Sequence, residues 1–258
     1  MLAWHGEPGL KQAAMERLRE HRRMDELIQG SYFPGNGKGC HLGCLTHSNR
    51  NAHELAARLF GIEERIGYWL EAVFEGLPTN ECADWVLAST DSIPVGADMS
   101  ICHHHFGAWL LGESGLLTIT NMNRDAIGAV QQLHARAVAG EIVTPEQWSA
   151  AESAAWSARA AAWSAAESAA RAARAAAWSA AESAAESAAR AARAAAWSAA
   201  WSAAESAAES AAWRTIAITS IEIFSQAPVL SLQQEIPQSV KQELCCRKLW
   251  CPEGVTVP

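Results

Sequence analysis

The chain has 258 residues, with 20 Lys and Arg against 28 Asp and Glu, and a formal net charge of −8. This acidic balance argues against a general nucleic-acid binder, which needs a basic face for phosphate groups. No apolar run approaches the roughly 20 residues of a membrane span, and the first residues lack the pattern of a signal peptide. Because the seven Cys are an odd number, we expect a cytoplasmic protein with reduced thiols and with no nucleic-acid or membrane partner.

Composition divides the chain into three segments. Residues 1–143 have ordinary globular composition, residues 144–213 form a low-complexity repeat, and residues 214–258 are predicted to be a short helix followed by an irregular tail. All nine His and four of the seven Cys lie in the first segment. We therefore expect any site that needs a metal ligand or a nucleophilic thiol to lie in residues 1–143.

Apolar residues recur at helical spacing along the first segment. The predicted helices cover 10–28, 51–60, 62–75, 78–87, a stretch from about 98 or 100 to 111, and 124–139. No run alternates long enough to require a sheet, so the predicted fold class is all-α. We expect residues 1–143 to fold independently, with a boundary near Gly140. The expected aromatic core residues are Phe60, Trp69, Phe74, Trp85 and Trp109.

Residues 37–47, Gly-Lys-Gly-Cys-His-Leu-Gly-Cys-Leu-Thr-His, contain three potential soft ligands: Cys40, Cys44 and His47. If a helix begins near Cys40, these positions share one face. Thiolate and imidazole suit Zn²⁺, and a structural zinc usually has four protein ligands. The pattern is therefore consistent with a structural zinc site, with Cys102 as the fourth ligand; Cys82 and residues 103–105, all His, are alternatives.

The same motif has two other interpretations. Cys40 and Cys44 can form a buried pair that packs as small apolar side chains, with His47 as a polar partner. Alternatively, the thiol of Cys40 or Cys44 is a nucleophile with a lowered pKa, and His47 or a His of 103–105 is its base. Gly37, Gly39 and Gly43 would then let backbone amides face an oxyanion.

The repeat begins at a strong helix start. Thr144 is a good N-cap, Pro145 suits the first helical position, and Gln147 completes a capping box. Residues 148–213 then contain only Ala, Ser, Trp, Glu and Arg, a composition that favours helix. Seven Trp belong to one stripe of large side chains: Trp148, Trp156, Trp163, Trp178, Trp197, Trp201 and Trp213.

The large side chains of this stripe recur on average about every 3.8 residues, which exceeds the period of a straight helix and favours a right-handed supercoil. The other positions are Ala and Ser, which allow helices to approach closely. Exposed Trp side chains would forfeit several kcal/mol each, so we expect them to pack. We predict burial of Trp163, Trp178 and Trp197 through coiled-coil-like self-association or a protein partner.

The motif at 37–47 is followed by Phe-Glu-Gly-Leu-Pro at 74–78, by Pro-Val-Gly-Ala-Asp-Met-Ser at 94–100, and by the Ala/Ser/Trp repeat. In this order the motifs resemble a family of uncharacterised bacterial and phage proteins, over roughly residues 10–213. The resemblance implies a phage-related origin and the same two-part architecture, and it implies no activity.

Two functional hypotheses follow. The first is a non-catalytic interaction or assembly protein, with either no cofactor or one structural zinc ion. The second is a cysteine-dependent enzyme that uses Cys44 with His47 as base. Whether the protein is an enzyme is left open by the sequence.

Overall fold

The computed structural model confirms the all-α fold class. It describes residues 1–31, 33, 37–112, 124–151, 153, 154, 157, 187–230, 235–252, 254 and 255, with side chains described from residue 127 in the helix at 124–138 and from residue 206 in the helix at 187–225. Among these residues there is no β-strand, only three isolated bridges. None of the described helices is long and apolar enough to cross a bilayer.

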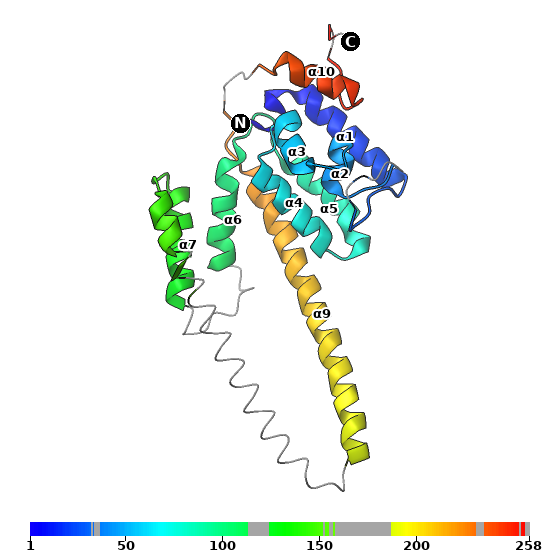
Figure 1. Cartoon of the computed structure of the whole chain (residues 1–258), viewed down its shortest axis with the longest axis vertical. Helices are drawn as coiled ribbons and strands as arrows, with labels where there is room; N and C mark the ends of the chain where they lie inside the picture. The colour runs from blue at the N-terminus through cyan, green and yellow to red at the C-terminus, as the bar shows by residue number, and fades with distance from the viewer. Residues whose placement is uncertain are drawn as a thin grey trace. The chain divides into compact units, whose positions relative to one another are not determined.

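The helices are labelled in Figure 1. In chain order they are η1 (Ala3–Gly6), α1 (Pro8–Arg23), α2 (His41–Thr46), α3 (Ala52–Phe60), α4 (Glu64–Gly76), α5 (Thr79–Ser92), η2 (Met99–Ile101), α6 (Cys102–Leu111), α7 (Arg124–Val138), α9 (Ser187–Ser225) and α10 (Gln238–Cys246). Residues 145–151 are also helical.

Several helix ends follow the predicted signals. Gly61 and Gly140 adopt positive φ just past α3 and α7, where a residue without Cβ is favoured. The capping box at the start of the repeat is present: the Thr144 amide donates to Gln147 Oε1 at 2.9 Å, and the Gln147 amide donates to Thr144 Oγ1 at 3.4 Å. The first predicted helix is shorter than expected, because it ends at Arg23 and Leu27 instead pairs with Gly39 in a β-bridge.

The chain forms two compact units whose limits differ from the predicted segments. The first unit contains residues 1–106 and 210–258, and the second contains residues 107–209. The predicted boundary at 143/144 does not separate them, since the C-terminal part of α9 returns to the first unit. In Figure 1 this orange part of α9 runs beside α4.

The core of the first unit is built from both ends of the chain. Phe60, Phe74 and Trp85 are buried as expected, and Trp69 is 9% exposed. Phe224, Leu244 and Leu249 belong to the same buried cluster. Apolar side chains of α9 and α10 therefore fill part of the core that residues 1–143 build. Whether residues 1–143 fold on their own stays a prediction. The C-terminal tail, predicted to be irregular, contains the helix α10.

The second unit contains the end of α6 together with α7. A Cβ on Gly107 would lie 2.6 Å from the His134 ring, and one on Gly112 would lie 1.9 Å from the Gln131 amide. These two glycines therefore let the helices approach closely. Trp109, predicted to be a core residue, lies in this unit and is only half-buried.

Candidate functional site

The motif at 37–47 forms a loop followed by the short helix α2. Gly37 adopts φ +84° in the loop. Cys40 is the N-cap of α2, and His47 is its C-cap in the left-handed conformation. A helix therefore begins next to Cys40 and follows the glycines, as the sequence predicted.

The four predicted zinc ligands have different partners. The Cys40 thiol donates to Glu71 Oε1 at 3.4 Å, and the Cys44 thiol donates to the Gly39 carbonyl at 3.4 Å. His47 Nε2 lies 3.0 Å from a ring nitrogen of His21. The Cys102 thiol lies in α6 and donates to the Ile223 carbonyl at 3.9 Å.

The zinc hypothesis gains no support from this arrangement. Within the described ranges, no three His, Cys, Asp or Glu side chains are grouped so that they could hold a metal ion. The alternative ligands are also engaged elsewhere: the Cys82 thiol donates to the Thr79 carbonyl, and Arg65 hydrogen-bonds to His103. Zinc binding stays a prediction, which measurement of the zinc content of the purified protein would test.

One buried polar cluster joins α2, α3 and α4. Glu71 accepts the Cys40 thiol through one carboxylate oxygen, and its other oxygen lies 2.5 Å from His53 Nε2. The His53 ring stacks on Tyr68 at 3.8 Å between centroids. The carboxylate thus lies between the thiol and the imidazole, which is not the order in which a histidine base activates a thiol.

A second polar cluster contains His47. His21 Nδ1 lies 2.7 Å from Glu26 Oε2, and its Nε2 faces His47. Phe33 stacks on the His47 ring, with 5.0 Å between centroids and 9° between planes. Glu26, His21 and His47 therefore form one hydrogen-bonded chain closed on one side by an aromatic ring.

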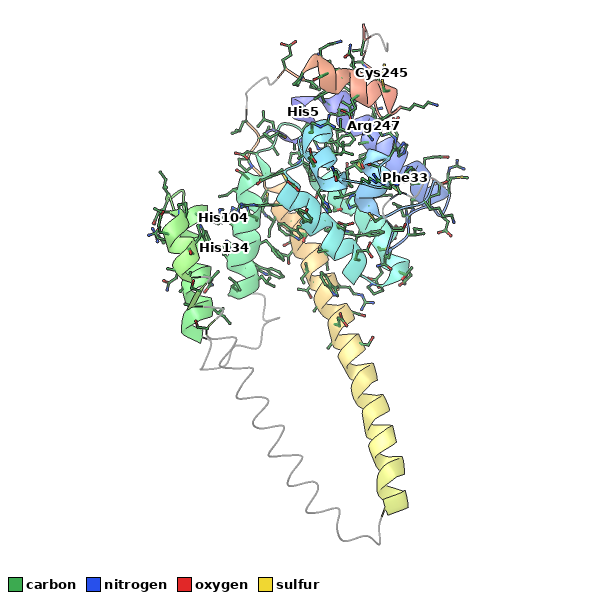
Figure 2. All side chains as sticks on the ribbon, in the orientation of Figure 1. His5, Phe33, His104, His134, Cys245 and Arg247 are labelled. Carbon is green, nitrogen blue, oxygen red and sulfur yellow. A yellow bond between two sulfur atoms is a disulfide. The ribbon has the colours of Figure 1, made fainter. Side chains whose placement is uncertain are left out.

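The C-terminal segment covers this second cluster. Arg17 Nη2 donates to the carbonyls of Lys248 and Leu249 at 2.6 and 2.5 Å, and the backbone of Arg247 hydrogen-bonds to His47. Figure 2 labels Arg247, Cys245 and Phe33 in this part of the unit. The Arg17 Nη1 atom is buried and has no hydrogen-bond partner, so this guanidinium depends mainly on carbonyls from the chain end.

Burial sets the charge state of the motif. It raises the pKa of the Cys40 thiol to about 12 and also raises that of Cys44. Burial, and then the charge of Arg17, lower the pKa of His47 to about 4. Near neutral pH both thiols are therefore protonated and His47 is neutral, the opposite of an activated thiolate–imidazolium pair.

The predicted Trp stripe is described only at its ends. The Trp148 ring contacts His134 at 4.8 Å in the second unit. Trp213 is half-buried beside Gly76, where a Cβ would lie only 2.1 Å from the indole. Trp156, Trp163 and Trp178, and the side chains of Trp197 and Trp201, lie outside the described residues. The same holds for the predicted burial of Trp163, Trp178 and Trp197.

The end of α9 is fixed to the first unit by specific contacts. Trp69 Nε1 donates to Ser220 Oγ at 3.0 Å, and the rings of Trp69 and Phe224 are 4.8 Å apart. Arg214 makes a two-pronged ion pair with Glu81, with Nη2 to Oε1 at 2.7 Å. The repeat helix is thus continuous with a helix that is part of a folded core.

Sequence reasoning missed several members of these clusters. His21 follows Leu10, Ala14 and Leu18 at helical spacing on the apolar face of α1, and this position could have marked it as buried. Glu71 and Arg17 gave no such signal, because their partners are distant in sequence.

Disulfide pairing of Cys245 with Cys251 was also not expected, since all thiols were predicted to be reduced.

No protein-family model, curated protein or solved structure matches the chain. Function is therefore inferred from the residues themselves. The resemblance to uncharacterised bacterial and phage proteins stays a prediction.

Proposed function

We propose that the protein is a non-catalytic assembly protein, in which the first unit holds the end of an Ala/Ser/Trp helical repeat that binds further copies of the chain. One observation carries this proposal: α9 runs without interruption from residue 187 to residue 225, and its last turns are part of a folded core. The folded core of the first unit therefore holds one end of the repeat helix.

The contacts of α9 support a holding role. Phe224 is fully buried, Ser220 accepts a hydrogen bond from Trp69, and Arg214 pairs with Glu81. These contacts combine apolar burial, a buried hydrogen bond and an ion pair over three turns. A solvated spacer helix would need none of them.

The composition of the repeat supports association. Between residues 187 and 212 of α9 there are only Ala, Ser, Arg, Trp and Glu, so most positions have side chains small enough for close helix packing. The apolar Trp side chains need partners to leave water. A second copy of the same helix offers both a small-residue face and matching Trp.

The state of the motif thiols also favours a non-catalytic protein. Cys40 and Cys44 are buried, protonated and hydrogen-bonded to acceptors. This is the environment of packed thiols and not of nucleophiles. The cysteine-dependent enzyme is consequently the weaker of the two hypotheses.

The test is a variant with Trp163, Trp178 and Trp197 changed to Ala, compared with the parent by analytical ultracentrifugation. Ala keeps helix propensity while it removes three of the largest apolar side chains. We expect the variant to have a lower oligomeric state. A matched control changes Arg171, Arg174 and Arg190 of the same repeat to Ala, and it should sediment like the parent. If the Trp variant also sediments like the parent, the repeat is not the association surface.

A further inference from the structure

The C-terminal end of α10 and the turn that follows it lie over Arg17 and His47. We propose that the disulfide between Cys245 and Cys251 is a redox-sensitive lock, which holds the turn 247–250 closed over these two side chains and releases it when reduced. This inference is independent of the proposed assembly through the repeat.

The disulfide spans the turn that makes the contacts. Cys245 lies in the last turn of α10, and Cys251 follows the turn, with 4.5 Å between their Cα atoms. The carbonyls of Lys248 and Leu249, which accept from Arg17, lie between the two joined residues. The bond therefore closes a small loop around the atoms that cover the cluster.

Non-covalent interactions also hold this turn: Arg247 Nε donates to Glu243 Oε1 at 2.9 Å, and Trp250 packs against the core. Within it the amides of Lys248 and Leu249 donate to carbonyls of Cys245 and Leu244 at 2.9 and 2.8 Å. Lys248 adopts φ +56°, a conformation that non-glycine residues rarely occupy. Leu249 is the one residue of 247–250 that is almost fully buried. The unfavourable φ of Lys248 opposes the closed turn, and the disulfide adds a covalent constraint to the non-covalent interactions that hold it.

The preceding helix has separate anchors, so release would be confined to the turn. Val240 and Leu244 of α10 are buried, and Arg58 forms an ion pair with Glu243. These contacts lie before the disulfide and do not need it. Reduction is therefore expected to open residues 247–250 while α10 stays in place.

The lock is accessible to small thiols. Cys251 is exposed and Cys245 is half-buried. A thiolate of a small reductant, such as a monothiol of the glutathione class, attacks one sulfur to form a mixed disulfide and releases the other Cys as a thiolate, which takes up a proton. A second reductant thiol then displaces the remaining Cys, so that two electrons and two protons reach the protein and the reductant leaves as its own disulfide.

The test compares hydrogen exchange of the full chain after equilibration with oxidised or reduced glutathione. Loss of a loop-closing disulfide should speed exchange of the amides of residues 248–250 by about tenfold or more, while amides of α10 at 241–244 keep their protection. Modification of His47 by diethyl pyrocarbonate should rise in parallel, and that of the fully buried His41 should not.

Two variants separate the lock from general effects of reduction. Changing Cys245 and Cys251 together to Ser should reproduce the reduced state in either buffer. Changing the exposed neighbour Cys246 to Ser should leave the redox response intact. Two results would overturn the proposal: equal exchange and His47 reactivity in both redox states, or seven free thiols in the unfolded oxidised protein where the structure has five.

Discussion

Phe224 offers the sharpest test of whether α9 completes the core of the first unit. Its side chain is fully buried and its ring lies 4.8 Å from the ring of Trp69. Replacing a buried Phe by Ala removes the transferred apolar surface and leaves a cavity, at a cost of about 3–5 kcal/mol. Since whole domains are stable by about 5–15 kcal/mol, Phe224→Ala should remove a large part of the free energy of unfolding.

The assay should report on the first unit alone. The four buried thiols at Cys40, Cys44, Cys82 and Cys102 all lie in that unit. Their labelling by a pulse of thiol reagent at increasing urea concentration measures its unfolding without interference from the repeat helix. For a urea dependence of about 2 kcal/mol per molar, the midpoint should fall by roughly 2 M.

The matched control lies on the same helix. Ile218 is 61% exposed, so Ile218→Ala removes little buried surface and should cost about 1 kcal/mol or less. If the two variants shifted the labelling midpoint equally, the side chains of α9 would not be part of the core. The sequence-based boundary near Gly140 would then be the better description.

Three further predictions concern the same unit. Gly76→Ala should destabilise it by about 1–3 kcal/mol, because the added Cβ would overpack against the Trp213 indole. Changing Trp213 to Ala as well should recover part of that loss in the same labelling assay. If the second change recovers nothing, the two residues do not touch. Burial lowers the pKa of His41 to about 3, so protonation of this side chain favours the unfolded chain. The contribution of neutral His41 to the free energy of unfolding should be fully present above pH 6.5 and should be lost as the pH falls towards 3. Urea midpoints measured against pH should therefore fall less steeply in acid for His41→Leu than for the parent. Because Cys246 is exposed and Cys40 is buried, iodoacetamide at pH 8 should label Cys246 about a hundredfold faster than Cys40, as measured by peptide mass spectrometry. Comparable rates would support the thiol-nucleophile hypothesis.

The helices were predictable because their signals are local. The capping box of Thr144 and Gln147 and the glycine after α3 act within a few residues of the helix ends that they define. Apolar spacing likewise marked most helices of the first unit. The fold class followed from these local patterns together with the absence of alternating runs.

The packing of distant segments was not predictable in the same way. Residues 216–224 form an apolar stretch that the sequence marks as helical, yet nothing local states that Phe224 meets Trp69. The loop motif shows the same limit, since Cys40 pairs with Glu71 and His47 with His21. Shared helix position indicated that Cys40, Cys44 and His47 could converge, whereas Cys44 bonds to the nearby Gly39 carbonyl and the other two bond to side chains outside the motif.

Hydrogen exchange along α9 tests most directly whether a folded unit holds the end of the repeat. If it does, amides at 216–224 exchange only when the whole unit unfolds, at the same rate as amides at 69–74 of α4 and far more slowly than solvated helix. The Phe224→Ala variant should accelerate both sets together. Rapid exchange at 216–224 while α4 stays protected would show that the helix is not anchored and would contradict the proposed assembly role.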